Sequence, residues 1–265
     1  MDYETACRRL LMKMTGKRHI MFCRRGNQAI RLSLRYARSF AETLALPDQG
    51  GWMTYGQSGV KEGYRIRFIP TDDGLVDVSL LEGLKDVPGV MILNAMPGYH
   101  ALLDMDAIAR WAKQQGVFLI NDVSGAIGTG QERFGDLILG SFGRWKPVSI
   151  RTGGFLAFDD GPIDGFLSRQ DLSHQIDFPA LLEQLTSLRP RLERWRMIHD
   201  AILKDFRGHV LHPGKGINVI VPFSSAGEKK AILSYCEKHK YPSVLCPKDI
   251  RVKRDAVSIE VKRLG

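Results

Sequence analysis

Cysteine is scarce in this sequence, and long apolar runs are lacking. The few cysteines are widely scattered, with neither a CxxC pair nor a cluster with histidine: Cys7, Cys23, Cys236 and Cys246. This spacing excludes a zinc-ribbon site and a disulfide framework, and it favours free thiols in a reducing compartment. No apolar run approaches the ~18 residues that a membrane span needs. Residues 1–17 are charged and amphipathic, unlike a signal peptide, so we expect a cytoplasmic protein.

The composition is that of a globular protein with excess positive charge. A chain of 265 residues, 44% hydrophobic and 25% charged, excludes disorder as the main state and predicts one large domain or two unequal ones. The net charge of +9 comes from small basic groups and not from one stripe. A solvated surface is the simplest interpretation, although an anionic ligand or nucleic acid stays open. No nucleic-acid-binding motif supports the latter.

Hydrophobic periodicity predicts alternating helices and strands in the first part of the chain. We expect helices at residues 4–14 and 27–42, with an apolar strand at 19–23 between them. After a turn at 47–51, strands are expected at 52–55 and 65–69.

The middle of the chain is more regular. Residues 89–94 and 117–120 are continuous apolar runs separated by an amphipathic helix at 104–115, a pattern typical of a parallel sheet covered on both faces. Residues 78–84 read as a helix, and residues 137–142 and 154–158 as further strands.

The last part changes order. A long helix is expected at 178–206, interrupted at Pro190. Strand 217–221, helix 226–238 and strand-like 250–252 and 257–261 follow. We therefore predict an α/β fold with a mostly parallel sheet between helices: a large domain at residues 1–205 and a small α+β domain at 206–265.

Three segments carry possible chemistry. Asp122 directly follows an apolar strand, where open α/β sheets bind ligands, although a strand-end Asp is also a common cap. Lys146 lies in a Gly- and aromatic-rich loop between two expected strands, with a surface lysine as the alternative. The third segment opens a helix, where free N–H groups favour a phosphate: Gly26, Asn27 and Gln28.

Together these residues match the needs of pyridoxal 5′-phosphate (PLP). The cofactor needs a lysine amine for its internal aldimine, the role of Lys146, and an acid beside its ring nitrogen, the role of Asp122. Ser141 joins the helix start as a phosphate anchor. Trp52 or Tyr55 supplies an aromatic face, with Trp52 favoured and core packing the alternative. Ser124 donates to Asp122 or to the ring, or else caps the loop.

In this arrangement the sequence resembles fold-type I PLP enzymes, nearest the DegT-like sugar aminotransferases. That branch carries Ser-Phe, a lysine five residues after the Ser, and Gly-Gly seven and eight residues beyond the lysine. The matching residues are Ser141, Phe142, Lys146, Gly153 and Gly154. Residues 105–128 and 26–30 also resemble the branch, and the likeness covers about residues 20–160. It implies a homodimer with the active site at the subunit interface.

Several positions depart from the branch's pattern. Gly125 stands where Gln or His is usual, Arg151 replaces a glycine, and Pro147 follows the lysine directly. The chain is also shorter, mostly in the C-terminal domain. Cofactor binding stays the expectation, whereas a sugar substrate loses support.

The function predicted from sequence is a PLP-dependent enzyme acting on an amino compound, with an aminotransferase as first choice. A PLP-dependent lyase or sulfur-transferring enzyme is an alternative, as is a non-catalytic binding or regulatory protein with an anionic partner. His100 is a further candidate for a substrate or cofactor contact, with a turn role as the alternative. Arg144 and Arg151 are candidates for binding phosphate or a substrate carboxylate, with a surface role as the alternative.

Overall fold

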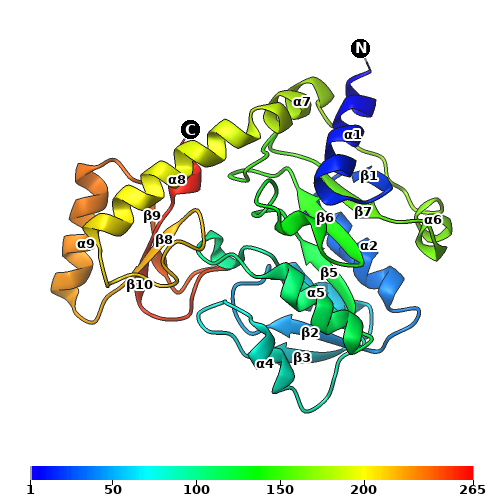
Figure 1. Cartoon of the computed structure of the whole chain (residues 1–265), viewed down its shortest axis with the longest axis horizontal. Coiled ribbons are helices and arrows are strands. Elements are labelled where there is room, and N and C mark those ends of the chain that lie inside the picture. Colours follow the sequence, from blue (N-terminus) through cyan, green and yellow to red (C-terminus); the bar gives the residue numbers. More distant parts are fainter. Residues whose placement is uncertain (1, 265) are drawn as a thin grey trace.

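A seven-stranded sheet forms the centre of the computed structural model, which describes residues 2–264 (Figure 1). Its order is β1-β7-β6-β5-β4-β2-β3, and all strands run parallel except β7, which is antiparallel to both β6 and β1. The strands are β1 (His19–Cys23), β2 (Thr43–Pro47), β3 (Arg65–Ile69), β4 (Val90–Asn94), β5 (Phe118–Asp122), β6 (Leu137–Ser141) and β7 (Gly154–Phe158). The predicted fold class, a mostly parallel sheet between helices, is confirmed.

Helices cover both faces of this sheet, because its central strands carry apolar side chains toward both faces. In β4, Ile92 faces one apolar cluster, with α2 (Gly26–Ala37), α3 (Thr54–Lys61) and α6 (Pro162–Leu167). Its neighbours Met91 and Leu93 face the opposite cluster, with α4 (Val78–Glu82) and α5 (Met105–Gln114). The helices α1 (Tyr3–Thr15) and α7 (Phe178–Thr186) cover Ile138 of β6 on this second face. Successive side chains of each strand point to opposite faces, so each strand contributes to the apolar clusters on both sides of the sheet.

The C-terminal part forms a second sheet that shares a core with the first. Three antiparallel strands, β8 (Val219–Pro222), β10 (Ala256–Ile259) and β9 (Ser243–Cys246), lie beside α9 (Ala226–Lys238). The long helix α8 (Leu188–Asp205) joins the two parts (Figure 1). Its Trp195 lies in the same buried cluster as Leu93 of β4 and Ile259 of β10. The division into residues 1–205 and 206–265 stays a prediction.

Four local predictions were wrong. The helix expected at 27–42 ends at Ala37, and a short buried strand, β2, follows it. Residues 52–55 are not a strand, because Tyr55 belongs to helix α3, where packing onto the sheet overrides the strand preference of aromatic residues.

The other two errors lie in the C-terminal half. The long helix breaks at Ser187 and not at Pro190, which falls in the first turn of α8 where its missing N–H costs nothing. Residues 250–252 are irregular, and the third strand of the small sheet is β9. Between residues 2 and 264, no helix is long and apolar enough to cross a membrane.

Candidate active site

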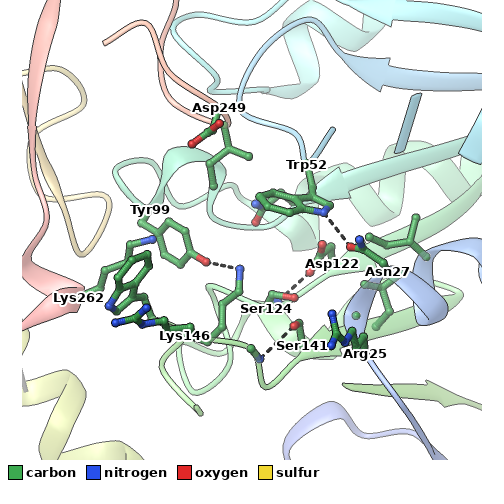
Figure 2. Close-up of a pocket in the computed structure, with 18 of the residues that line it drawn as sticks. Arg25, Asn27, Trp52, Tyr99, Asp122, Ser124, Ser141, Lys146, Asp249 and Lys262 are labelled. Carbon is green, nitrogen blue, oxygen red and sulfur yellow. Dashed lines mark hydrogen bonds between the residues drawn. The ribbon is translucent and has the colours of Figure 1, made fainter. Parts of the chain in front are cut away.

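A cavity of about 410 Å³ lies at the carboxyl edge of the large sheet (Figure 2). Its walls come from the start of α2, the ends of β5 and β6, the loop after β6 and the C-terminal segment. In parallel sheets the strand ends converge on one edge, so residues far apart in sequence meet there. The cavity brings together Gly26, Asn27, Trp52, Asp122, Ser124, Ser141 and Lys146.

Asp122, the last residue of β5, is held from two sides. Asp122 is only 4% exposed, and one of its carboxylate oxygens accepts a hydrogen bond from the Tyr55 hydroxyl at 2.6 Å. The other accepts from the backbone N–H of Ser124 at 2.9 Å. Burial, together with the Asp122 charge, raises the pKa of Tyr55, so this phenol stays protonated and acts as the donor. Asp122 is thereby fixed as a hydrogen-bond acceptor facing the cavity.

Lys146 points into the cavity from the loop between β6 and β7. Its ammonium donates to the Tyr99 hydroxyl at 2.5 Å and lies 5.8 Å from the centre of the Trp52 ring (Figure 2). Burial opposes the charge, but the Tyr99 oxygen and the Asp122 carboxylate outweigh it and raise the pKa of Lys146. Lys146 is therefore not a solvated surface lysine.

A phosphate-sized cradle lies where α2 begins. Gly26 is the first residue of α2, and a Cβ built on it would fall 2.6 Å from Cβ of Ser141. The absence of a side chain there leaves Ser141 Oγ beside the first N–H groups of the helix, which have no partner within the helix itself. With the helix dipole, this donor set suits a phosphate. The cavity thus offers an amine, an acid and an anion site, the three features that PLP requires.

Trp52 and Gln28 lie differently with respect to this cavity. The indole N–H of Trp52 donates to Oδ1 of Asn27 at 2.8 Å, which holds the ring against the cavity (Figure 2). The side chain of Gln28 turns away: it accepts from the Arg24 N–H and donates to the Asp171 carbonyl. The backbone N–H of Gln28 donates to the Arg25 carbonyl. Gln28 therefore does not line the cavity with its side chain, and its expected role in binding phosphate stays a prediction.

Sequence reasoning missed the C-terminal wall of the cavity. Arg251 and Lys262, 7% and 8% exposed, line it together with Arg263. All three surround the fully buried carboxylate of Glu260, at 2.8, 3.8 and 3.1 Å respectively. Burial, reinforced by the charges of Lys146, Arg251 and Arg263, lowers the pKa of Lys262 to about 6 in spite of Glu260. The sequence offered a signal for Arg251 alone, as part of a small basic group at residues 251–254, and a solvated surface is the simplest interpretation of such a group.

The remaining candidates separate into two groups. Arg144 and Arg151 both line the cavity, and the guanidiniums of Arg144 and Arg263 lie 4.4 and 4.2 Å from the Trp145 ring centre. His100 does not line it. It is buried beside the cavity with Nε2 on the Asp73 carbonyl at 3.0 Å, so a structural role fits it.

Comparison with known proteins places the fold. No protein-family model matches the chain, and no curated protein matches it either. Solved structures do match. DesV of S. venezuelae matches with a TM-score of 0.77 and 15% identity, and the match covers the whole of this chain and 85% of the DesV chain. A DegT DnrJ EryC1 StrS aminotransferase from Brucella abortus matches with a TM-score of 0.73 and 15% identity. That match covers the whole of this chain and 87% of the aminotransferase chain.

A third match is a dehydratase. The E. coli GDP-4-keto-6-deoxy-D-mannose-3-dehydratase, whose structure holds hydrated PLP, gives a TM-score of 0.74 at 14% identity, with 98% of this chain and 87% of that chain covered. The chain therefore has the fold of type I PLP-dependent transferases. Within that fold, its structural neighbours are of the DegT type that the sequence resembles.

Proposed function

We propose that this protein is a PLP-dependent enzyme acting on an amino compound, with transamination as the first choice of reaction. The observation that carries the proposal is the meeting of Lys146, Asp122 and the α2 cradle in one cavity. Each was expected from sequence separately, and each faces the same space. The resemblance to solved aminotransferases supports the proposal through the fold alone.

Each residue has a distinct task in this proposal. When bound, PLP supplies an electron sink for bonds at the substrate's amino carbon. The Lys146 amine attaches the cofactor and, once released, moves a proton at the substrate carbon. Asp122 holds the proton on the ring nitrogen. Gly26, Asn27 and Ser141 bind the phosphate, and Trp52 covers the ring.

Reaction type and assembly belong to the same proposal. The dehydratase among the structural neighbours is a reminder that one fold carries several PLP reactions. A lyase or sulfur-transferring activity is thus the second candidate.

We further propose a homodimer, on the resemblance alone, and light scattering of the purified chain tests this directly.

The decisive experiment is reductive trapping of PLP followed by peptide mass mapping. The cavity contains two amines, Lys146 and Lys262, so the site of labelling is informative. We expect borohydride to fix one pyridoxyl group on Lys146, and the K146M variant to lose the visible absorbance and the label. The K113M variant, at an exposed lysine on α5, is the matched control and should keep both. Labelling of Lys262 in the wild type, or no labelling at saturating PLP, would reject the assignment.

A second measurement separates an enzyme from a binding protein. The PLP-loaded chain is mixed with a panel of amino compounds, and the cofactor spectrum is followed. Spectral conversion with an amino donor supports transamination. A labelled Lys146 without conversion by any amino compound would favour the non-catalytic alternative.

A further inference from the structure

Tyr99 is held in an unusual backbone conformation beside the cavity. It ends a short 3-10 helix, η1 (Pro97–Tyr99), and both Gly98 and Tyr99 have left-handed backbones, with φ of 57° and 64°. Residues with a Cβ avoid this region because it costs ~1 kcal/mol or more. The Tyr99 carbonyl accepts from the N–H groups of Ile217 and Asn218 at 2.7 and 2.8 Å, which fixes the turn.

This conformation directs the Tyr99 ring into space left open by Gly125. A Cβ built on Gly125 would fall 3.0 and 3.2 Å from two carbons of the Tyr99 ring, tighter than ordinary contact. Gly125 lies in the loop that begins at Asp122. The glycine that appeared in the sequence as a departure is thus the position that admits the ring.

The side chain of Tyr99 contacts two lysine amines. Its hydroxyl accepts from Nζ of Lys146 at 2.5 Å, and Nζ of Lys262 lies 3.2 Å from the ring centre (Figure 2). The Lys262 amine therefore packs against the face of the ring, while the hydroxyl at the ring's edge contacts Lys146. Tyr99 therefore connects the C-terminal segment to the loop after β6.

We propose that Tyr99 is a positioning residue that fixes the Lys146 amine in the cavity, and that Gly125 is required because it makes room for the Tyr99 ring. The catalytic meaning of this role rests on the proposed function. The charged groups that line the cavity with Lys146 are Asp122 from β5, Asp249, Lys262 from the C-terminal segment and five arginines: Arg25, Arg144, Arg151, Arg251 and Arg263. The Tyr99 oxygen and Asp122 favour the charged form of the Lys146 amine.

The first test measures the pH dependence of Lys146 reactivity in the full-length chain without added cofactor. Competitive acetylation across pH, read by peptide mass mapping, gives the midpoint at which the Lys146 amine loses its proton. Y99F keeps the ring and removes the hydrogen-bond acceptor of the ammonium, so the midpoint should fall by about one pH unit or more.

The control for this test is Y235F. Tyr235 also makes a side-chain hydrogen bond to a charged residue through its hydroxyl, in this case to the Asp205 carboxylate at 2.6 Å, but it lies on α9 away from the cavity. Its loss should leave the Lys146 midpoint unchanged. An unchanged midpoint in Y99F would overturn the proposal, because a ring that only fills space does not need its hydroxyl.

The second test asks whether Gly125 acts through Tyr99. G125A should displace the ring and lower the Lys146 midpoint in the same direction as Y99F, and G125A should add nothing in a Y99A background. Additive effects would show that Gly125 acts independently and would overturn that part of the proposal. Because both tests use the chain without cofactor, they are decided even if borohydride trapping fails and the proposed function falls.

Discussion

At the scale of the residue, the acid in the cavity depends on a buried phenol. Tyr55 donates to Asp122 from beneath the cavity floor, and loss of its hydroxyl leaves one carboxylate oxygen without this donor. We expect Y55F to lower the free energy of unfolding by about 1–3 kcal/mol and to weaken PLP binding about tenfold. Denaturant unfolding and cofactor titration measure the two effects.

A second buried tyrosine gives the control for that prediction. The hydroxyl of Tyr64 donates to the Leu34 carbonyl at 2.7 Å, remote from the cavity. Y64F should therefore lose stability without losing PLP affinity. Equal losses of affinity in both variants would mean that Tyr55 acts only through general stability.

His100 gives a prediction about pH. Burial, with the neighbouring His212, lowers the pKa of His100 to about 4, whereas in the unfolded chain it is near 6.5. Between these two pH values the unfolded state binds a proton on His100 that the folded state does not bind. The free energy of unfolding therefore decreases as pH falls from about 6.5 to 4, by at most about 3 kcal/mol. H100Q keeps a polar group toward the Asp73 carbonyl and should flatten this slope in denaturant unfolding. An equally steep slope would contradict the assignment.

At the scale of the element, the start of α2 needs a residue without a side chain. G26A would place a Cβ against Ser141 and push the helix start away from β6, so we expect PLP affinity to fall tenfold or more. Gly165 in α6 has open space around it and is the matched control. G165A should leave affinity unchanged and stabilise the chain by about 0.5–1 kcal/mol. Cofactor titration of the two variants tests the prediction. Equal PLP affinities would reject the assignment of the α2 start as the phosphate site.

At the scale of the whole molecule, one carboxylate holds the second sheet to the cavity. Glu260 is fully buried among Arg251, Lys262 and Arg263, and although burial opposes its charge, Arg251, Lys262 and Ser258 lower the pKa of Glu260. Its contribution to stability is thus present above the unfolded pKa of about 4.5 and fades as pH falls through the lower folded value. E260Q should lower the free energy of unfolding by about 3 kcal/mol at neutral pH.

An exposed ion pair provides the comparison for Glu260. Glu193 pairs with Arg189 along α8 with both side chains largely in solvent. E193Q should change the free energy of unfolding by only about 0.5 kcal/mol. Similar losses in E260Q and E193Q, measured by denaturant unfolding, would show that the buried network contributes little.

Much of the fold and half of the candidate site followed from local patterns in the sequence. The apolar runs around β4 and β5 indicated strands buried on both faces, and an amphipathic helix lies between them as expected. Because parallel strands end at one edge, Asp122 and Lys146 were expected to face the same space as the glycine that opens α2. These inferences needed only short stretches of chain and one topological rule.

What only the tertiary structure decided are contacts between residues distant in the chain. Nothing in the sequence near Tyr55 or Tyr99 indicates that their hydroxyls meet Asp122 and Lys146, since the register of packed elements sets those distances. Likewise, the arginines and lysine around Glu260 are unremarkable in sequence and become buried only when the second sheet closes against the first. Local periodicity fixes which face of an element is apolar, whereas the burial and partners of a polar group depend on what the rest of the chain brings against it.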